Sequence, residues 1–232
     1  MLFRSGQRVL PEAQLVEQAL TRVGDAATTA EHAVEGVVRV ALTETLASVV
    51  VVPRVLPALL RRHPGLRVDL LVGNTAADLA RREADVAVRF FLTPSGDLVT
   101  RRVARWETAV VASPALAKSL RGRAPRDWPF VAAWLPGGSA PEEAWRAQVG
   151  GGEARVSTNS FHAQLEAVRA GLGVAVLPTA LSRHVGLVAL PLPRGVELPP
   201  PLDAWLVTPR ALRKVPRVAA VVGALSEVLA HV

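Results

Sequence analysis

From residue 36 onward, short apolar runs alternate with longer stretches of helical periodicity. The run Val37–Leu42 is nearly continuous, as expected of a strand that helices cover on both faces. A helical stretch over residues 46–62 follows, interrupted by two prolines, and His63-Pro64-Gly65 ends it. The alternation then continues with a strand at 66–72, a helix at 75–82 and strands at 85–90, 98–104 and 107–112. Strands and helices that alternate with short turns predict an α/β fold with a parallel sheet.

The stretch 154–177 loosely repeats the beginning of this pattern. Each copy has a polar turn where a strand ends and a helix begins, namely Thr43-Glu44-Thr45 and Thr158-Asn159-Ser160. Free backbone N–H groups and the positive end of the helix favour a small anion at such a turn. Two half-sites that face each other predict a cleft that closes on a ligand, and therefore a sensor rather than a catalyst.

The remaining pattern continues the alternation, with Ser113 placed to cap a helix that begins at Pro114. Further elements are expected at 114–120 (helix), 130–134 (strand), 161–170 (helix), 173–177 (strand), from Pro178 (short helix), and at 186–190 and 203–208 (strands). A final helix near 213–230 has one apolar face.

Residues 12–35 predict one amphipathic helix with a heptad-like apolar seam. The seam consists of Val16, Leu20, Val23, Ala27, Ala30 and Val34. Two interpretations remain open, a helix packed on its own domain and a dimerising linker helix. Small side chains at Ala27 and Ala30 would permit close approach of a second helix and favour dimerisation.

Composition narrows the function classes. The chain has no Cys, which excludes disulfides and thiolate catalysis. The net charge of +7 is compatible with binding to nucleic acid. Lys is rare, however, Ile is absent and Arg is scattered along the chain, so a genome whose codon bias favours Arg explains the positive charge better. No apolar run resembles a signal peptide or a membrane span, so we expect a cytoplasmic protein without membrane contact.

Motifs for catalysis are missing from the sequence. The five His residues show no metal-ligand spacing, and neither a nucleophile elbow nor a phosphate-binding loop occurs. Glu142-Glu143 is interpreted as a solvated helix start, which leaves His162 as the single candidate for proton transfer. We therefore predict no enzyme, no metal site and no cofactor.

Several short motifs in one order resemble the effector-binding domain of LysR-type transcriptional regulators. They are Gly36–Thr43, Leu56–Pro64, Asp78-Leu79 through Asp85–Arg89, Val110–Pro114 and Gly171–Pro178. The resemblance covers about residues 36–230, and residues 1–35 resemble the remnant of a wing followed by the family's dimerising linker helix. The helices that would enter DNA are missing from this chain, so DNA would be reached only through a winged helix-turn-helix that the chain lacks.

The resemblance implies a type II periplasmic-binding-protein-like fold: two α/β lobes with a cleft between them, preceded by an N-terminal linker helix. The effector-binding domain would span 36–232, with lobe 1 at about 36–110 and 207–232 and lobe 2 at about 113–201. The two crossing strands are expected near 110–112 and 202–206.

In such a cleft, the family pattern implies ligand contact by the two polar turns and by aromatic walls. The expected ligand-binding residues are Thr43, Glu44, Thr45, Phe91, Thr93, Trp134, Thr158, Asn159 and Ser160, with Phe90 beside them. In the alternative, Thr45 and Ser160 only cap their helices. Glu44 in the cleft would repel an anion and select an amine or hydroxyl, whereas outside it Glu44 is a first-turn helix carboxylate.

We therefore expect a ligand-sensing regulatory domain that binds a small carboxylate-containing effector and acts as a homodimer or tetramer. Two alternatives remain, a solute-binding protein of periplasmic type and a dimerising module that modulates full-length regulators.

Overall fold

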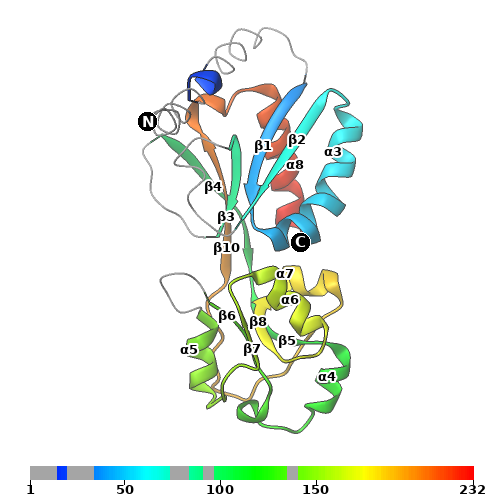
Figure 1. Ribbon diagram of the computed structural model, residues 1–232, viewed down its shortest axis with the longest axis vertical. Helices are drawn as coiled ribbons and strands as arrows, with labels where there is room; N and C mark the ends of the chain where they lie inside the picture. Colours follow the sequence, from blue (N-terminus) through cyan, green and yellow to red (C-terminus); the bar gives the residue numbers. More distant parts are fainter. Residues whose placement is uncertain (1–14, 20–33, 74–83, 91–96, 135–140) are drawn as a thin grey trace, which may run out of the picture.

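The computed structural model describes residues 15–19, 34–73, 84–90, 97–134 and 141–232 (Figure 1). The helix expected at 75–82 lies outside these residues. Of the helix expected over 12–35, residues 15–19 are described and helical, and Leu15 and Val16 are 41% and 60% exposed. Val34 and Glu35 are also described and are not helical, so the helix does not reach residue 35 as expected. The other expected dimerisation positions lie outside the described residues, namely Leu20, Val23, Ala27 and Ala30.

A five-stranded sheet with the order β2-β1-β3-β10-β4 forms the first lobe (Figure 1). Its strands are β1 (Gly36–Leu42), β2 (Leu66–Val72), β3 (Val86–Arg89), β4 (Leu98–Trp106) and β10 (Leu202–Pro209). β1 pairs in parallel with β2 and β3, whereas β10 runs antiparallel to β3 and β4. The expected strands are confirmed, and the sheet is mixed because the chain returns to it through β10.

One face of β1 is buried along its length, and the other is buried at Ala41 but exposed at Arg39, so the cover on both faces that its apolar run predicts is only partial. On one face Val38, Val40 and Leu42 pack in a core with helix α8 (Pro216–Ala230). On the other face Ala41 packs against Ala87. In the described part of the first lobe, the main hydrophobic core therefore lies between β1 and α8.

One helical run leads from the end of β1 to the turn before β2. It comprises α2 (Glu44–Leu46), the π-helical segment η2 (Ala47–Val55) and α3 (Leu56–Arg62). Pro53 lies inside η2 and has no N–H to donate to the preceding turn. The Leu56 N–H then bonds to the Val51 carbonyl, five residues back, and the helix widens locally.

The described part of the second lobe has two small sheets. One has the order β8-β5-β9, with β5 (Thr108–Ala112) antiparallel to β8 (Ala175–Pro178) and β9 (Val188–Ala189). The other pairs β6 (Val131–Ala133) in parallel with β7 (Val156–Thr158). Around them lie α4 (Pro114–Ser119), α5 (Pro141–Gln148), α6 (Phe161–Arg169), α7 (Thr179–Ser182) and the short 3₁₀ turns η4 (Pro125–Asp127) and η5 (Arg183–Val185). The 3₁₀ turn η6 (Arg210–Leu212) follows β10 and belongs to the first lobe.

The chain passes between the lobes at two adjacent places. β4 ends at Trp106 in the first sheet and β5 begins at Thr108 in the second, so Glu107 is the first crossing. The return runs through Pro199–Pro201 to Leu202, which pairs with Trp106. Both crossings lie a few residues before the places expected from the sequence, because residues 108–111 pair with β8 and 202–206 pair with β4.

The lobes also touch beside the crossings. Val49 of η2 packs on the second-lobe core, and Ala180 and Leu181 of α7 join the first-lobe core. The Ser48 Oγ lies 3.4 Å from the His162 Nδ1 of α6. Within the described ranges, no helix is both long enough and apolar enough to span a bilayer.

Candidate functional site

A cavity of about 350 Å³ lies where the two lobes meet. Elements of both lobes form its walls, together with the second crossing. Its lining residues are Thr43, Thr45, Phe90, Thr108, Glu142, Phe161, Leu165, Val176, Leu177, Pro178, Leu181, Pro199, Pro200, Pro201, Leu202, Asp203 and Trp205. The volume suits a small organic molecule.

Most of this wall is apolar. Phe90 at the end of β3 and Trp205 on β10 come from the first lobe, and Phe161 opens α6 in the second. Phe90 also contacts Trp106 with ring centroids 5.7 Å apart, so the wall is continuous with the aromatic packing of the first lobe. An apolar ligand body would gain free energy by leaving water here.

The first polar turn contributes two hydroxyl groups to the cavity. The Thr43 Oγ1 accepts a hydrogen bond from the Leu46 N–H at 3.4 Å and caps α2. Thr45 is 5% exposed, and its Oγ1 has no hydrogen-bond partner among the described residues. The cap expected at Thr45 is therefore formed by Thr43 instead, which leaves the buried Thr45 hydroxyl without a partner among the described residues. Glu44 is exposed and does not line the cavity.

The second polar turn stabilises its own helix. The Thr158 Oγ1 accepts from the Ser160 N–H at 3.1 Å, and the Ser160 Oγ accepts from the Ala163 N–H at 3.2 Å. Neither residue lines the cavity, and Asn159 is exposed. Phe161, the next residue along, does line it. The cap expected at Ser160 is confirmed, and this turn reaches the cavity through an aromatic ring.

The remaining expected residues lie elsewhere. Trp134 is 49% exposed and does not line the cavity. Phe91 and Thr93 lie outside the described residues, although the neighbouring Phe90 lines the cavity.

Glu142 is a cavity residue and not the solvated helix start expected from the sequence. Its Oε1 accepts from the Ala133 N–H and from the Gln164 Nε2, each at 2.6 Å. Burial raises the pKa of Glu142 to about 7, although these two hydrogen bonds act to lower it. The expectation failed because β6 and α6 pack against the first turn of α5 and cover Glu142, while Glu143 stays exposed.

Asp203 places a second carboxyl group at the cavity wall. Its Oδ2 lies 3.5 Å from the Arg102 Nη1, and its side chain is 27% exposed. Its Oδ1 is buried and has no hydrogen-bond partner among the described residues. The first lobe thus presents a hydrogen-bond acceptor as well as two hydroxyl groups.

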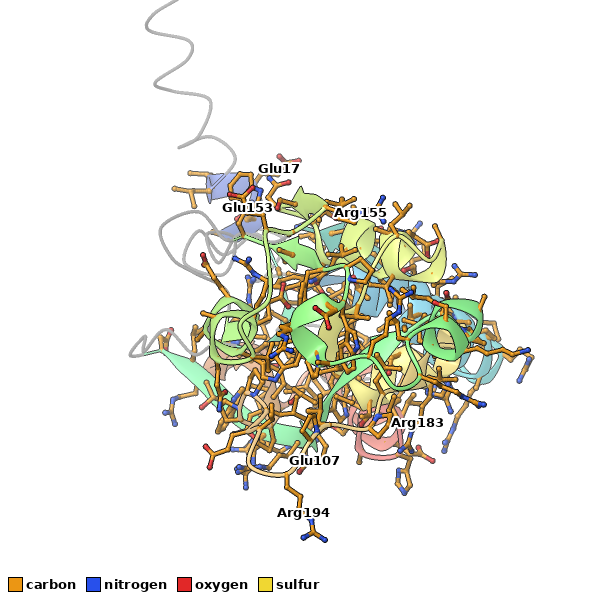
Figure 2. The ribbon with its side chains drawn as sticks, turned by 90° about the horizontal axis from the view of Figure 1, so that it is seen from below. Glu17, Glu107, Glu153, Arg155, Arg183 and Arg194 are labelled. Atoms are coloured by element: carbon orange, nitrogen blue, oxygen red, sulfur yellow. The ribbon has the colours of Figure 1, made fainter. Side chains whose placement is uncertain are left out.

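No Arg, Lys or His occurs among the described residues that line the cavity. Of the described basic side chains, Arg102 pairs with the lining residue Asp203 without lining the cavity itself, and Arg194, for example, points away from the body of the molecule (Figure 2). The cavity is therefore an apolar chamber with acidic and hydroxyl groups. Among the described residues, no cluster of side chains could hold a metal ion.

Similar structures have the same architecture. The regulatory domain of CrgA, a LysR-type transcriptional regulator from Neisseria meningitidis, superposes with a TM-score of 0.69 at 16% identity, covering 84% of this chain and 99% of that one. The AmpR effector binding domain from Citrobacter freundii gives 0.65 at 19% identity, covering 84% and 98%. The full-length virulence activator AphB from Vibrio cholerae gives 0.64 at 17% identity, covering 96% and 78%. These likenesses show the fold.

The sequence itself identifies the family. No curated protein matches the chain significantly. Residues 31–230, however, match the family described as the LysR substrate binding domain, whose fold is of the type II periplasmic-binding-protein kind. Domains of this family are regulatory and are not enzymes. The chain thus belongs to the LysR substrate-binding domain family, as its motifs predicted.

Proposed function

We propose that this chain is the sensing domain of a transcriptional regulator and that its effector binds in the cavity between the lobes. One observation carries the proposal: the walls come from both lobes and from the return crossing. A ligand there contacts Thr45 in one lobe and Glu142 in the other. Such a ligand changes the relative stability of the arrangements of the two lobes, which is the requirement for a ligand-controlled switch.

The sequence predicted a carboxylate-containing effector bound by two polar turns. The hydroxyl groups of Thr43 and Thr45 support this class. The two carboxyl groups of Glu142 and Asp203 oppose it, since like charges repel in a cavity of low polarity. The geometry therefore supports small-molecule sensing more strongly than it supports an anionic effector.

We propose further that the signal passes through a dimer formed by the N-terminal helix. Exposed Leu15 and Val16 on its described turn support a helix–helix contact. Control of DNA would then require winged helix-turn-helix domains joined to this helix, in a cytoplasmic regulator. Val16→Glu should shift the molar mass in light scattering from dimer to monomer, with Val72→Glu, exposed on the edge strand β2, as the control.

The sensing function can be tested by a thermal-shift screen of small metabolites, followed by calorimetry. Pro200→Trp places a large side chain at an exposed position of the cavity wall and should abolish binding of true effectors. Leu172→Trp changes an exposed residue that does not line the cavity and serves as the matched control. Ligands that bind both variants as they bind the parent chain would contradict the assignment to this cavity.

A further inference from the structure

We propose that the cavity selects an amine with an apolar body, and that Glu142 binds its protonated nitrogen. This inference rests on the proposed sensing function and specifies the chemistry of the same site. It reverses the sign of the effector charge expected from the sequence.

The hydrogen bonds of Glu142 leave one oxygen atom for a ligand. Both of its protein donors, the Ala133 N–H and the Gln164 Nε2, bond to Oε1. Among the described residues, Oε2 has no donor. A carboxylate accepts several hydrogen bonds, and charge-assisted ones are the strongest. The Glu142 side chain is thus fixed in orientation by one oxygen and able to bind an ammonium group with the other.

Two more acceptors without partners line the same cavity. The Thr45 Oγ1 and the Asp203 Oδ1 are buried, and neither has a hydrogen-bond partner among the described residues. Buried polar atoms without partners are costly, so groups that remain in this state in a folded protein call for an explanation. Both atoms are closed off in this arrangement of the lobes, so a donor on the ligand would reach them only if the lobes moved.

Charge distinguishes an amine from a carboxylate in this cavity. An anion would meet Glu142 and Asp203 and, among the described lining residues, no basic side chain. A cation would meet the carboxyl group of Glu142 inside an apolar wall, where electrostatic attraction is stronger than in water. It would also meet Asp203, whose charge Arg102 partly compensates at 3.5 Å. The apolar body would lie against Phe161, Trp205 and the prolines.

The pH dependence of binding separates these two classes. The pKa of Glu142 is raised by burial to about 7. Among the described residues, the other charged groups that line the same cavities are Asp203, which pairs with Arg102, and Glu143 and Arg146 on the helix of Glu142. An amine binds the ionised form, so its affinity should rise from pH 6 to pH 8. A carboxylate would bind the protonated form, and its affinity should fall over the same range.

Three probes of equal length test the proposal by calorimetry: 4-phenylbutylamine, 4-phenylbutanol and 4-phenylbutyrate. At pH 8 we expect the amine to bind the whole chain at least tenfold more tightly than the carboxylate. Between pH 6 and pH 8 its affinity should rise about tenfold, because Glu142 changes from mostly protonated to mostly ionised. The alcohol should show little pH dependence.

Two variants at adjacent positions locate the effect. Glu142→Gln should lower the amine affinity about tenfold or more and leave the alcohol unchanged, whereas Glu143→Gln, which removes the same charge from an exposed neighbour, should leave both unchanged. The pH series on the parent chain requires no variant and covers the case in which Glu142→Gln fails to fold.

Preference for 4-phenylbutyrate, a reversed pH dependence or equal losses in both variants would overturn the amine assignment and leave the sensing function in place. Absence of binding by all three probes, or binding that Pro200→Trp does not abolish, would count against the cavity as the effector site as well.

Discussion

The Gln164 Nε2 donates a hydrogen bond to the Glu142 Oε1 at 2.6 Å and so joins α6 to α5 at the cavity wall. Gln164 is fully buried and also donates to the Val131 carbonyl at 3.3 Å. One amide group therefore links helix α5, helix α6 and strand β6. The carboxyl group of Glu142 is therefore held in place by the hydrogen bond from Gln164 as well as by its own helix.

We expect Glu142→Gln to make the protein more stable at pH 8. The raised pKa of Glu142 means that the folded state holds a proton that the unfolded chain releases near its ordinary pKa of 4.5. Stability is thus lost as the pH rises from about 4.5 to 7. The variant should avoid this loss and gain about 2 kcal/mol in the free energy of unfolding at pH 8, but little at pH 4. Urea unfolding at both pH values measures the difference, and equal stability of the two proteins at pH 8 would refute the shifted pKa.

Thr45→Val and Thr43→Val should change stability in opposite directions. Valine at position 45 replaces a buried hydroxyl without a partner by a methyl group and should raise the free energy of unfolding by about 1 kcal/mol. Valine at position 43 removes the cap of α2 and should lower it by about 1 kcal/mol. Thermal unfolding of the ligand-free proteins distinguishes them. A loss at both positions would show that the Thr45 hydroxyl has a partner.

Gly173 and Gly223 provide a second matched pair. A Cβ at Gly173 would lie 2.8 Å from the Pro129 carbonyl oxygen, where Val174 bonds to the same carbonyl, so Gly173→Ala should cost about 2 kcal/mol. Gly223 lies inside α8 with nothing within 4 Å of an added Cβ. Gly223→Ala should therefore stabilise the protein by about 0.5–1 kcal/mol. Denaturant midpoints measure both changes, and similar effects at the two sites would contradict this packing.

The contact between Arg54 and His184 predicts a titration shift across the lobe junction. The Arg54 Nη1 lies 2.5 Å from the His184 Nε2, and the pKa of His184 is lowered by burial and by the Arg54 charge. Arg54→Ala should raise that pKa toward 6.5, as followed by NMR of the imidazole protons. An unchanged His184 titration would mean that the two side chains do not meet in solution.

The positions of the strands, the helices and the helix N-caps could be predicted from the sequence, because they depend on residues that are neighbours in the chain. The apolar run at Val37–Leu42, the polar turn before Phe161 and the Ser113-Pro114 start each fix a boundary through neighbouring residues. The sequence predicted only an irregular helix where the π-helical segment lies. Pro53 shows that one backbone hydrogen bond is missing, but it does not show which hydrogen bonds the following residues form instead.

The acidic groups of the cavity could not be found in this way. Glu142 looks solvated beside Glu143, and only the packing of α5 on β6 and α6 buries one of the two. Asp203 follows a proline run and belongs to a strand with no motif of its own. Both depend on contacts between residues far apart in the sequence, whereas Thr43 and Thr45 were predicted because their place follows from the strand before them.

The two crossings between the lobes are unlike in length and stiffness. One is the single residue Glu107, and the other is Pro199–Pro201, in which each ring fixes the backbone angle φ. Because an extended chain spans at most about 3.3–3.6 Å per residue, both crossings keep the facing ends of the two sheets close together. Under the proposed function, occupancy of the cavity would therefore move the lobes relative to each other only in ways that leave these ends together.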